Sequence, residues 1–136
     1  MSEEKNTPNQ VSEFKGDFIL DRYKSKVVWD TIGSHWHNTY ELYFLLCGTR
    51  RYFVGHNIFN VTPGDLVIVP RNELHHTARH TQEHYDRIII YFTDEFAKNF
   101  YQQVGKEYFD KFLNLGCVQI PPKQQERVKQ IFVKME

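Results

Sequence analysis

Short runs of aromatic and β-branched residues follow one another between residues 18 and 92, with polar and turn residues between them. Runs of this composition are typical of β-strands. The pattern predicts strands at Phe18–Arg22, Lys26–Asp30, Tyr40–Cys47, Arg50–Val54, Ile58–Val61, Leu66–Val69, His75–His80 and Tyr85–Phe92. So many short strands at close spacing indicate an antiparallel sandwich or barrel.

Turn residues separate these predicted strands. Gly48 and Gly55 each interrupt one pair of runs. Pro63 and Gly64 predict a type II turn, because proline fixes φ at the second position and glycine supplies a positive φ at the third. The turn residues therefore support the division of this region into short strands.

The hydrophobic period changes after Phe92. Thr93 is a suitable helix N-cap, and two acidic residues follow it, where the positive end of the helix dipole favours them. Three later segments repeat apolar residues at helical spacing. These predicted apolar faces are Phe96, Phe100 and Val104; Tyr108, Phe109, Phe112 and Leu113; and Val128, Ile131, Phe132 and Met135. The chain is therefore predicted to be mainly β, with two or three amphipathic helices after the strands.

The same pattern divides the chain into three parts. Residues 1–13 are polar and have no period, so they predict a flexible tail. Residues 14–92 form the predicted β part, and residues 93–136 form the helical part. The last helix reaches Glu136 without a stop signal, so we expect the chain to be cut from a longer protein.

Composition narrows the classes of function. The 136 residues suit one domain, and 17 basic residues balance 17 acidic ones, which argues against a broad basic face for nucleic acid or membrane lipid. There is no apolar run of the roughly 18 residues that a membrane span needs, and the polar N-terminus is not a secretory signal. We therefore expect a cytoplasmic protein whose two cysteines, Cys47 and Cys117, are thiols.

All seven histidines lie between residues 35 and 84, which suggests a shared site. His35 and His37 are two residues apart, so on a strand they share a face, with α-carbons about 6–7 Å apart. Glu41 has the same parity, but a straight strand would place it about 13 Å from His37. Glu41 joins the site only if the chain bends near Asn38, which tolerates positive φ, or crosses to a facing sheet. His75, from another strand, would complete a set of three imidazoles and one carboxylate.

This set of side chains suits two kinds of ligand. It matches a divalent transition metal such as Fe, Mn, Ni, Cu or Zn. Imidazole and carboxylate groups also form hydrogen bonds with the hydroxyls of an organic effector. The sequence predicts a pocket at His35, His37, Glu41 and His75 and leaves both ligands open.

Strand parity adds two further residues to the predicted pocket. Tyr43 shares the parity of Glu41, so it should face the cavity, where it either stacks on a sugar ring or belongs to the ordinary core. Arg79 shares the parity of His75 and either lines the mouth of the pocket or is a solvated surface residue. Arg50 and Arg51 are predicted to be rim or exposed charges.

Two motifs carry a resemblance to the cupins, which are small jelly-roll β-barrels. The first motif is H-x-H, three residues, Glu and a later Gly, and here it comprises His35, His37, Glu41 and Gly48. The second is Gly, five residues, Pro, four residues and His, and here it comprises Gly64, Pro70 and His75. Asn72 stands where cupins often have glycine, and asparagine is the usual substitute where φ is positive. The resemblance implies a jelly-roll barrel.

A closer resemblance covers roughly residues 17–135. The segments HWHNTYELYFLLCG, YFV, GDLVIVPRNELH and RIIIYF, followed by amphipathic helices, resemble the N-terminal sensor domain of AraC-type transcription regulators. That resemblance implies a barrel that binds a small effector, often a sugar, and helices that form a homodimer. It also implies DNA binding by a C-terminal helix-turn-helix module, which is absent from this sequence. The rival interpretation is a metal-dependent cupin enzyme, such as a dioxygenase or a sugar isomerase, with the metal on the same four residues.

The predicted helices bear on the homodimer. Three amphipathic segments present more apolar faces than one sheet surface easily covers, which favours a second copy as partner over packing on the chain's own barrel. The residues of this dimer or packing face are Phe109, Phe112, Leu113, Val128, Ile131, Phe132 and Met135. No nucleophile motif or phosphate-binding loop is present, so the sensor interpretation assigns no catalytic residue.

Overall fold

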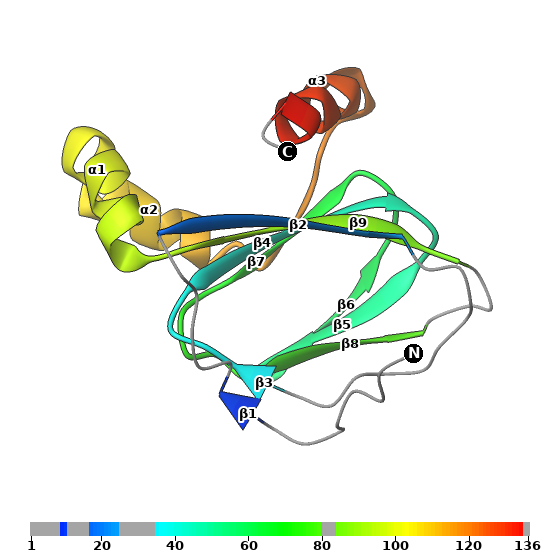
Figure 1. The fold of residues 1–136 in the computed structure, drawn as a ribbon, viewed down its shortest axis with the longest axis horizontal. Helices are drawn as coiled ribbons and strands as arrows, with labels where there is room; N and C mark the ends of the chain where they lie inside the picture. The colour runs from blue at the N-terminus through cyan, green and yellow to red at the C-terminus, as the bar shows by residue number, and fades with distance from the viewer. Residues whose placement is uncertain (1–8, 11–16, 25–34, 80–83, 135–136) are drawn as a thin grey trace.

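The computed structural model describes residues 9–10, 17–24, 35–79 and 84–134, and these residues form two five-stranded sheets and three helices. The first sheet has the order β1 (Asn9–Gln10), β3 (His35–Trp36), β8 (His75–Arg79), β5 (Arg50–Val54) and β6 (Asn57–Val61). The second has the order β10 (Cys117–Gln119), β7 (Asp65–Val69), β4 (Tyr40–Cys47), β9 (Asp86–Phe92) and β2 (Phe18–Lys24). The sheets face each other (Figure 1). All described strand pairs are antiparallel except β1 with β3.

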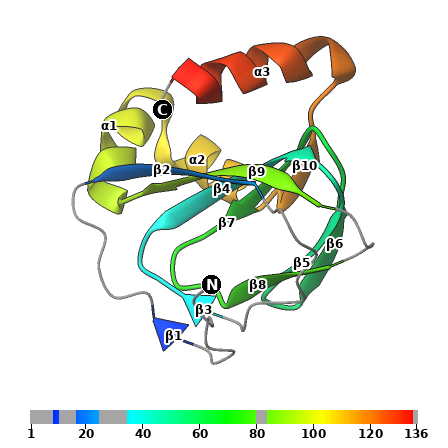
Figure 2. The same cartoon turned by 45° about the vertical axis from the view of Figure 1, so that its right-hand side comes forward.

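The three helices lie outside the second sheet. They are α1 (Asp94–Val104), α2 (Lys106–Leu113) and α3 (Pro122–Lys134), and Figures 1 and 2 place them on the side away from the first sheet. The hydroxyl of Thr93 accepts a hydrogen bond from the backbone of Phe96 at 3.1 Å, so the predicted N-cap is confirmed. Gly105, with φ of 102°, separates α1 from α2. None of the described helices has the length and apolarity needed to cross a membrane.

The predicted fold class is confirmed, and most strand predictions agree to within a few residues. The predicted strand Lys26–Asp30 lies outside the described residues. Three short strands, β1, β3 and β10, were not predicted. β10 has only three residues between two helices, too few to show an alternating pattern, and it forms the edge of the second sheet by pairing with β7. β1 lies within the predicted tail, and the rest of residues 1–13 is not described.

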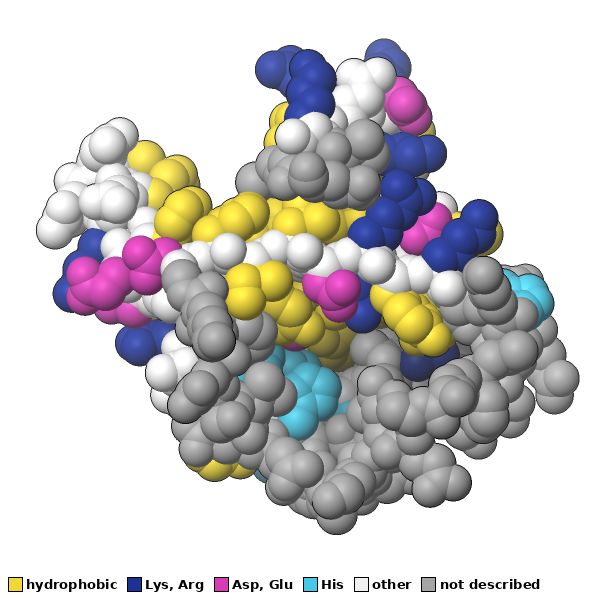
Figure 3. All heavy atoms as spheres, in the orientation of Figure 1, with side chains coloured by type: hydrophobic (Ala, Val, Ile, Leu, Met, Phe, Trp, Pro, Cys, Tyr) yellow, Lys and Arg dark blue, Asp and Glu magenta, His cyan; other side chains and the backbone are white. Residues whose placement is uncertain are grey.

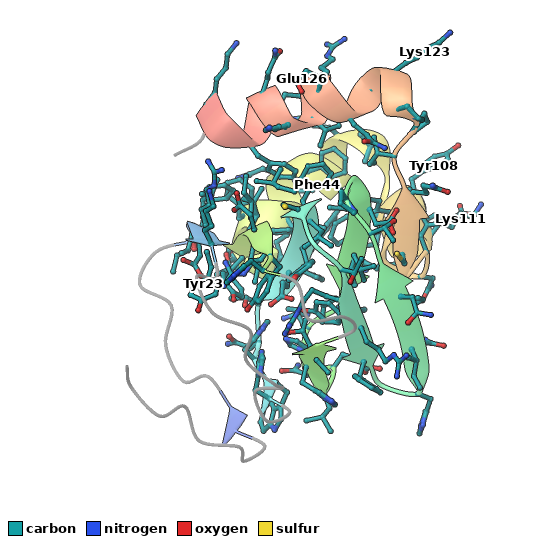
Figure 4. The ribbon with its side chains drawn as sticks, turned by 90° about the vertical axis from the view of Figure 1, so that its right-hand side faces the viewer. Tyr23, Phe44, Tyr108, Lys111, Lys123 and Glu126 are labelled. Carbon is teal, nitrogen blue, oxygen red and sulfur yellow. The ribbon has the colours of Figure 1, made fainter. Side chains whose placement is uncertain are left out.

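The outer face of the second sheet carries an aromatic core against the helices. Phe44 projects from β4, and its ring centroid lies 5.2 Å from that of Phe132 on α3. Tyr40 projects from the same face, with its ring 5.3 Å from Phe109 on α2. Figure 4 shows Phe44 beneath α3, whereas Lys123 points away from the sheet. This contact layer holds the helices to the sheet by burying apolar area.

The helix residues predicted as a dimer or packing face therefore separate into groups. Phe109 and Phe132 are buried in the chain's own core, and Leu113 and Val128 pack against it. Phe112 is partly buried, Ile131 is exposed, and Met135 lies outside the described residues. Other apolar side chains of the helices are also exposed: Phe96, Phe100, Val104 and Tyr108.

Candidate functional site

Three histidines and a glutamate converge between the two sheets. His35 on β3 lies opposite His75 on β8 in the first sheet. The chain then leaves that sheet and enters the second as β4, with His37 in the crossing and Glu41 near the start of the strand. One potential ligand atom from each of the four lies within 4.8 Å of the others. The crossing to a facing sheet is therefore what brings Glu41 to the histidines.

The backbone feature that supports this crossing lies at Asn72, in the loop before β8, and not at Asn38 within the crossing itself. Asn72 has φ of 62°, and it is the one non-glycine residue with positive φ in the part of the chain that the structure describes. This confirms the positive φ expected for asparagine at the position where cupins often have glycine. The backbone N–H of Asn72 donates a hydrogen bond to the His37 carbonyl oxygen at 2.7 Å and so joins the crossing to the loop before β8. The positive φ considered for Asn38 is not observed.

The cluster is almost entirely removed from solvent. His37, Glu41 and His75 are each 1% exposed, and His35 is partly buried. The imidazole rings are in contact, with ring centroids 4.2 Å apart for His35 and His75 and 4.8 Å apart for His37 and His75. Figure 3 shows histidine side chains in a hollow beneath the edge of the second sheet. Ionisable groups are seldom buried in this way unless they pair or bind a ligand.

Backbone carbonyls fix the orientation of two imidazoles. Nδ1 of His37 lies 3.0 Å from the Thr39 carbonyl oxygen, and Nδ1 of His75 lies 2.7 Å from the Glu73 carbonyl oxygen. Because a carbonyl only accepts, Nδ1 of His75 carries the proton, and its Nε2 is directed to the centre of the site. Nδ1 of His37 also lies 2.9 Å from the Thr39 hydroxyl, and its Nε2 faces the same centre. Both Nε2 atoms lie 3.5 Å from Oε1 of Glu41. An imidazole held through Nδ1 by a backbone carbonyl is the usual arrangement around a metal-binding histidine.

The electrostatics of the cluster centre on Glu41. Burial alone would raise the pKa of Glu41, but the positive charge of His75 and hydrogen bonds to the carboxylate outweigh burial and hold this pKa below its ordinary value. Burial alone would lower the pKa of His75, but the charge of Glu41 and the hydrogen bonds to Glu41 and to the Glu73 carbonyl together outweigh burial and raise this pKa above its ordinary value. The Tyr52 hydroxyl donates to Oε2 of Glu41, and burial followed by that negative charge raises the pKa of Tyr52. Glu41 is therefore a carboxylate that requires a cation beside it.

The residues present fit a divalent metal. Nε2 of His75 is buried and has no hydrogen-bond partner, while it faces the Glu41 oxygen at 3.5 Å. Two lone-pair donors face each other in this way only when a proton or a metal ion lies between them. Three imidazole nitrogens and one carboxylate oxygen match the ligands of Fe, Mn, Ni, Cu or Zn.

The other predicted pocket residues lie further along the same interior. Tyr43 is buried on the inner face of β4, where its ring contacts that of Tyr52 at 4.9 Å. Arg79 is the last residue of β8 and is the register partner of Arg50 on β5. Four residues of straight strand, about 13 Å, separate Arg79 from His75, so the backbone does not bring it into the four-residue cluster. The ligand-binding roles of Tyr43 and Arg79 remain predictions.

The sequence analysis missed two residues of the interior. Tyr52, the hydrogen-bond partner of Glu41, was not named as a candidate. Arg50 was predicted to be a rim or exposed charge, and this prediction is wrong because the residue is only 3% exposed. Arg51 is exposed, as predicted. Arg50, Tyr52 and Val54 share the inner face of β5. Strand parity links these three residues, but it does not say which face of β5 is the inner one.

Two facing antiparallel sheets with a buried His/Glu cluster between them define a cupin-like fold. The chain belongs to the family of AraC-like ligand-binding domains, whose family model matches residues 20–135. No curated protein matches the sequence.

Solved structures agree with the fold assignment. ToxT from Vibrio cholerae is 11% identical with a TM-score of 0.63, over 86% of this chain and 48% of that one. Oxalate decarboxylase from Bacillus subtilis, described with Mn(II) centres, is 19% identical with a TM-score of 0.51, over 61% of this chain and 23% of that one. The DMSP lyase DddQ from Ruegeria pomeroyi is 22% identical with a TM-score of 0.51, over 57% and 39%. This chain thus spans less than half the length of each, and at these identities the likeness concerns the fold alone.

Proposed function

We propose that this chain is the effector-sensing and dimerisation domain of an AraC-type transcription regulator, and that its effector is a small polar molecule such as a sugar bound between the two sheets. The family membership supports a ligand-binding role. The observation that carries the proposal is the buried cluster at His35, His37, Glu41 and His75, which takes side chains from both sheets. A ligand bound there contacts both sheets at once and favours one arrangement of them over another by its differential affinity.

Substitution of the cluster tests effector binding. We expect one of a panel of sugars and sugar acids to raise the melting temperature of the chain by mass action. His37→Ala and Glu41→Ala should abolish that shift while the circular dichroism spectrum stays that of a folded β protein. Asn60→Ala, at an exposed position of β6, is the matched control and should keep the shift. An unchanged response in the first two variants would disprove the assignment of the pocket.

A bound metal is the second candidate for the same four residues. Support comes from the carbonyl-anchored imidazoles and from the buried Nε2 of His75, which faces the carboxylate. A divalent metal held by His35, His37, Glu41 and His75 would act as a Lewis acid toward an oxygen of the ligand. Elemental analysis of protein prepared without chelator separates the candidates. Stoichiometric Fe, Mn or Ni would favour the cupin-enzyme alternative, a dioxygenase or a sugar isomerase, over a metal-free sensor.

The dimerisation part of the proposal rests on exposed apolar side chains of the helices. Phe96, Phe100 and Val104 recur on one face of α1 and are all more than two-fifths exposed, and Ile131 on α3 is also exposed. Apolar groups at this density are typical of an interface. Sedimentation should detect a dimer that Phe100→Asp dissociates and that the neighbouring exposed variant Asn99→Asp does not. A monomer for the unsubstituted chain would overturn this part, and DNA contact through a further module is proposed only by analogy with the family.

A further inference from the structure

A second polar region lies inside the fold, at the other end of β5 from the histidines. Its centre is Arg50, which is 3% exposed. Nη2 of Arg50 donates to the Thr77 hydroxyl at 3.0 Å, and the guanidinium lies 4.1 Å from the ring centroid of Tyr85. Nε of Arg50 is buried without a hydrogen-bond partner. Across the part of the chain that the structure describes, no carboxylate forms an ion pair with Arg50.

Two other arginines of the neighbouring strands show what Arg50 lacks. Arg87 on β9 forms an ion pair with Asp21 at 3.0 Å, and Arg22 on β2 forms one with Asp86 at 2.9 Å. Both of those arginines are more exposed than Arg50, so their charges need a partner less. A buried guanidinium without an anion is costly, because burial removes its hydration. Arg50 therefore has the greater need of an anion and lacks one.

The hydroxyl of Tyr43 is a second buried group that lacks a hydrogen-bond acceptor. Tyr43 is 1% exposed, and its hydroxyl forms no hydrogen bond in the structure. Tyr43 belongs to the buried inner core against which Tyr85 packs, and Arg50 lies over the Tyr85 ring, so the two groups occupy the same end of the interior. Burial raises the pKa of Tyr43, and the charge of Arg50 opposes that increase. A buried hydroxyl and a buried guanidinium nitrogen, both without acceptors, are complementary to one and the same chemical group, an anion with several oxygen atoms.

We propose that Arg50 and Tyr43 bind the carboxylate group of the effector, so that the effector is a small hydroxylated carboxylate rather than a neutral sugar. This inference rests on the proposed function, which places the effector between the sheets. A guanidinium offers parallel N–H donors to a carboxylate, and the Tyr43 hydroxyl offers one more. Tyr52 lies between the two regions: its ring contacts Tyr43, and its hydroxyl binds Glu41. The His/Glu cluster is then left to bind hydroxyl groups at the other end of the same ligand.

Nuclear magnetic resonance of the ¹⁵N-labelled chain tests the inference directly. The Nε–H signal of Arg50 is assigned by its loss in Arg50→Gln. The probes are galacturonate, gluconate and acetate, each paired with a neutral counterpart, namely galactose, sorbitol and acetamide. We expect an acid to shift the Arg50 signal in a saturable way and its neutral counterpart to leave that signal in place.

Variants separate recognition of the anion from folding. Arg50→Gln should weaken binding of the acid about a hundredfold, and Tyr43→Phe about tenfold. Tyr43→Phe should not lower the melting temperature of the free protein, because the hydroxyl it removes has no partner. Arg51→Gln is the matched control, since Arg51 is the next residue of β5 and faces solvent. Binding should be unchanged in that variant.

The outcomes distinguish this inference from the proposed function. If a neutral sugar perturbs the signals of His37 and its neighbours while no acid moves Arg50, the inference is overturned and the proposed function stands. If no probe moves either region, both are overturned. If an acid binds with equal affinity to Arg50→Gln and to the unsubstituted chain, Arg50 is not its partner and the inference is wrong.

Discussion

The two faces of β4 have opposite chemistry although their residues alternate along one strand. The outer face presents Tyr40 and Phe44 to the helices in an aromatic core. The inner face presents Glu41 and Tyr43 to the facing sheet, where a carboxylate, two imidazoles and two tyrosines are buried together and the imidazole of His35 is partly buried. Burial of the outer face stabilises the fold at about 25 cal/mol per Å² of apolar surface. Burial of polar groups on the inner face costs free energy, so we attribute that arrangement to ligand binding.

The largest expected effect is on the outer face. Phe44→Ala removes a ring that is 2% exposed and packs against Phe132, so it should lower the free energy of unfolding by about 3–5 kcal/mol. Urea denaturation measures this loss. Ligand or metal affinity per folded molecule should stay the same, because Phe44 does not face the cluster. If the affinity falls along with stability, the two faces of β4 are coupled, and the outer face does not act on stability alone.

The reactivity of the Cys117 thiol measures how far solvent and reagents reach the inner region at the edge formed by β10. Cys117 packs against the inner core, and its burial followed by the negative charge of Asp65 raises its pKa to about 11. Only the thiolate is alkylated, so at pH 8 iodoacetamide should react with Cys117 about a hundredfold more slowly than with an unperturbed thiol. The rate should rise about tenfold per pH unit until the pH reaches that pKa.

Cys47→Ser isolates this reaction, because Cys47 is the exposed thiol and would otherwise consume the reagent. Mass spectrometry follows the addition to Cys117. A rate that is fast at pH 8 and levels off near pH 9 would show that solvent reaches the inner region through the edge at β10.

Metal affinity should respond to the inner face alone. Glu41→Gln keeps the size of the side chain but removes the carboxylate charge, so affinity for Mn²⁺ or Zn²⁺ should fall at least about tenfold. Titration calorimetry after treatment with a chelator measures this change. Glu107→Gln, an exposed substitution on α2, is the control and should leave affinity unchanged. Equal affinity for all three proteins would place the metal elsewhere or exclude it.

The sequence predicted the outer face and the cluster better than the rest of the interior. On β4, Tyr43 shares the parity of Glu41, so the carboxylate identified the inner side and left Phe44 on the other. Strand β5 offers no such contrast: Arg50 and Tyr52 lie on one side, and Arg51 and Phe53 on the other. An arginine and an aromatic residue on each face give no basis for choosing the buried one. Only the pairing of β5 with β8 and β6 settles the choice.

The distance between His37 and Glu41 shows a different limit. Their spacing of four residues excludes them from one site on a straight strand, and the sequence could state only that a bend or a crossing was required. The crossing depends on partners far along the chain, including the hydrogen bond from Asn72 to His37. Long-range contacts of this kind leave no periodic signal in the sequence.

The smallest expected effect is that of Tyr43→Phe, and it is compared with Tyr52→Phe because the two rings touch but their hydroxyls differ. Tyr52→Phe removes a hydrogen bond to a buried carboxylate, so it should lower the free energy of unfolding by about 1.5–3 kcal/mol. Tyr43→Phe removes a hydroxyl without a partner, so its effect should be about zero or slightly stabilising. Urea denaturation of both variants measures the difference, and each serves as the control for the other, since the same atom is removed from neighbouring rings. An equal loss in both would mean that Tyr43 has an acceptor within the free protein. The inner region would then be a satisfied polar core rather than a site that awaits an anion.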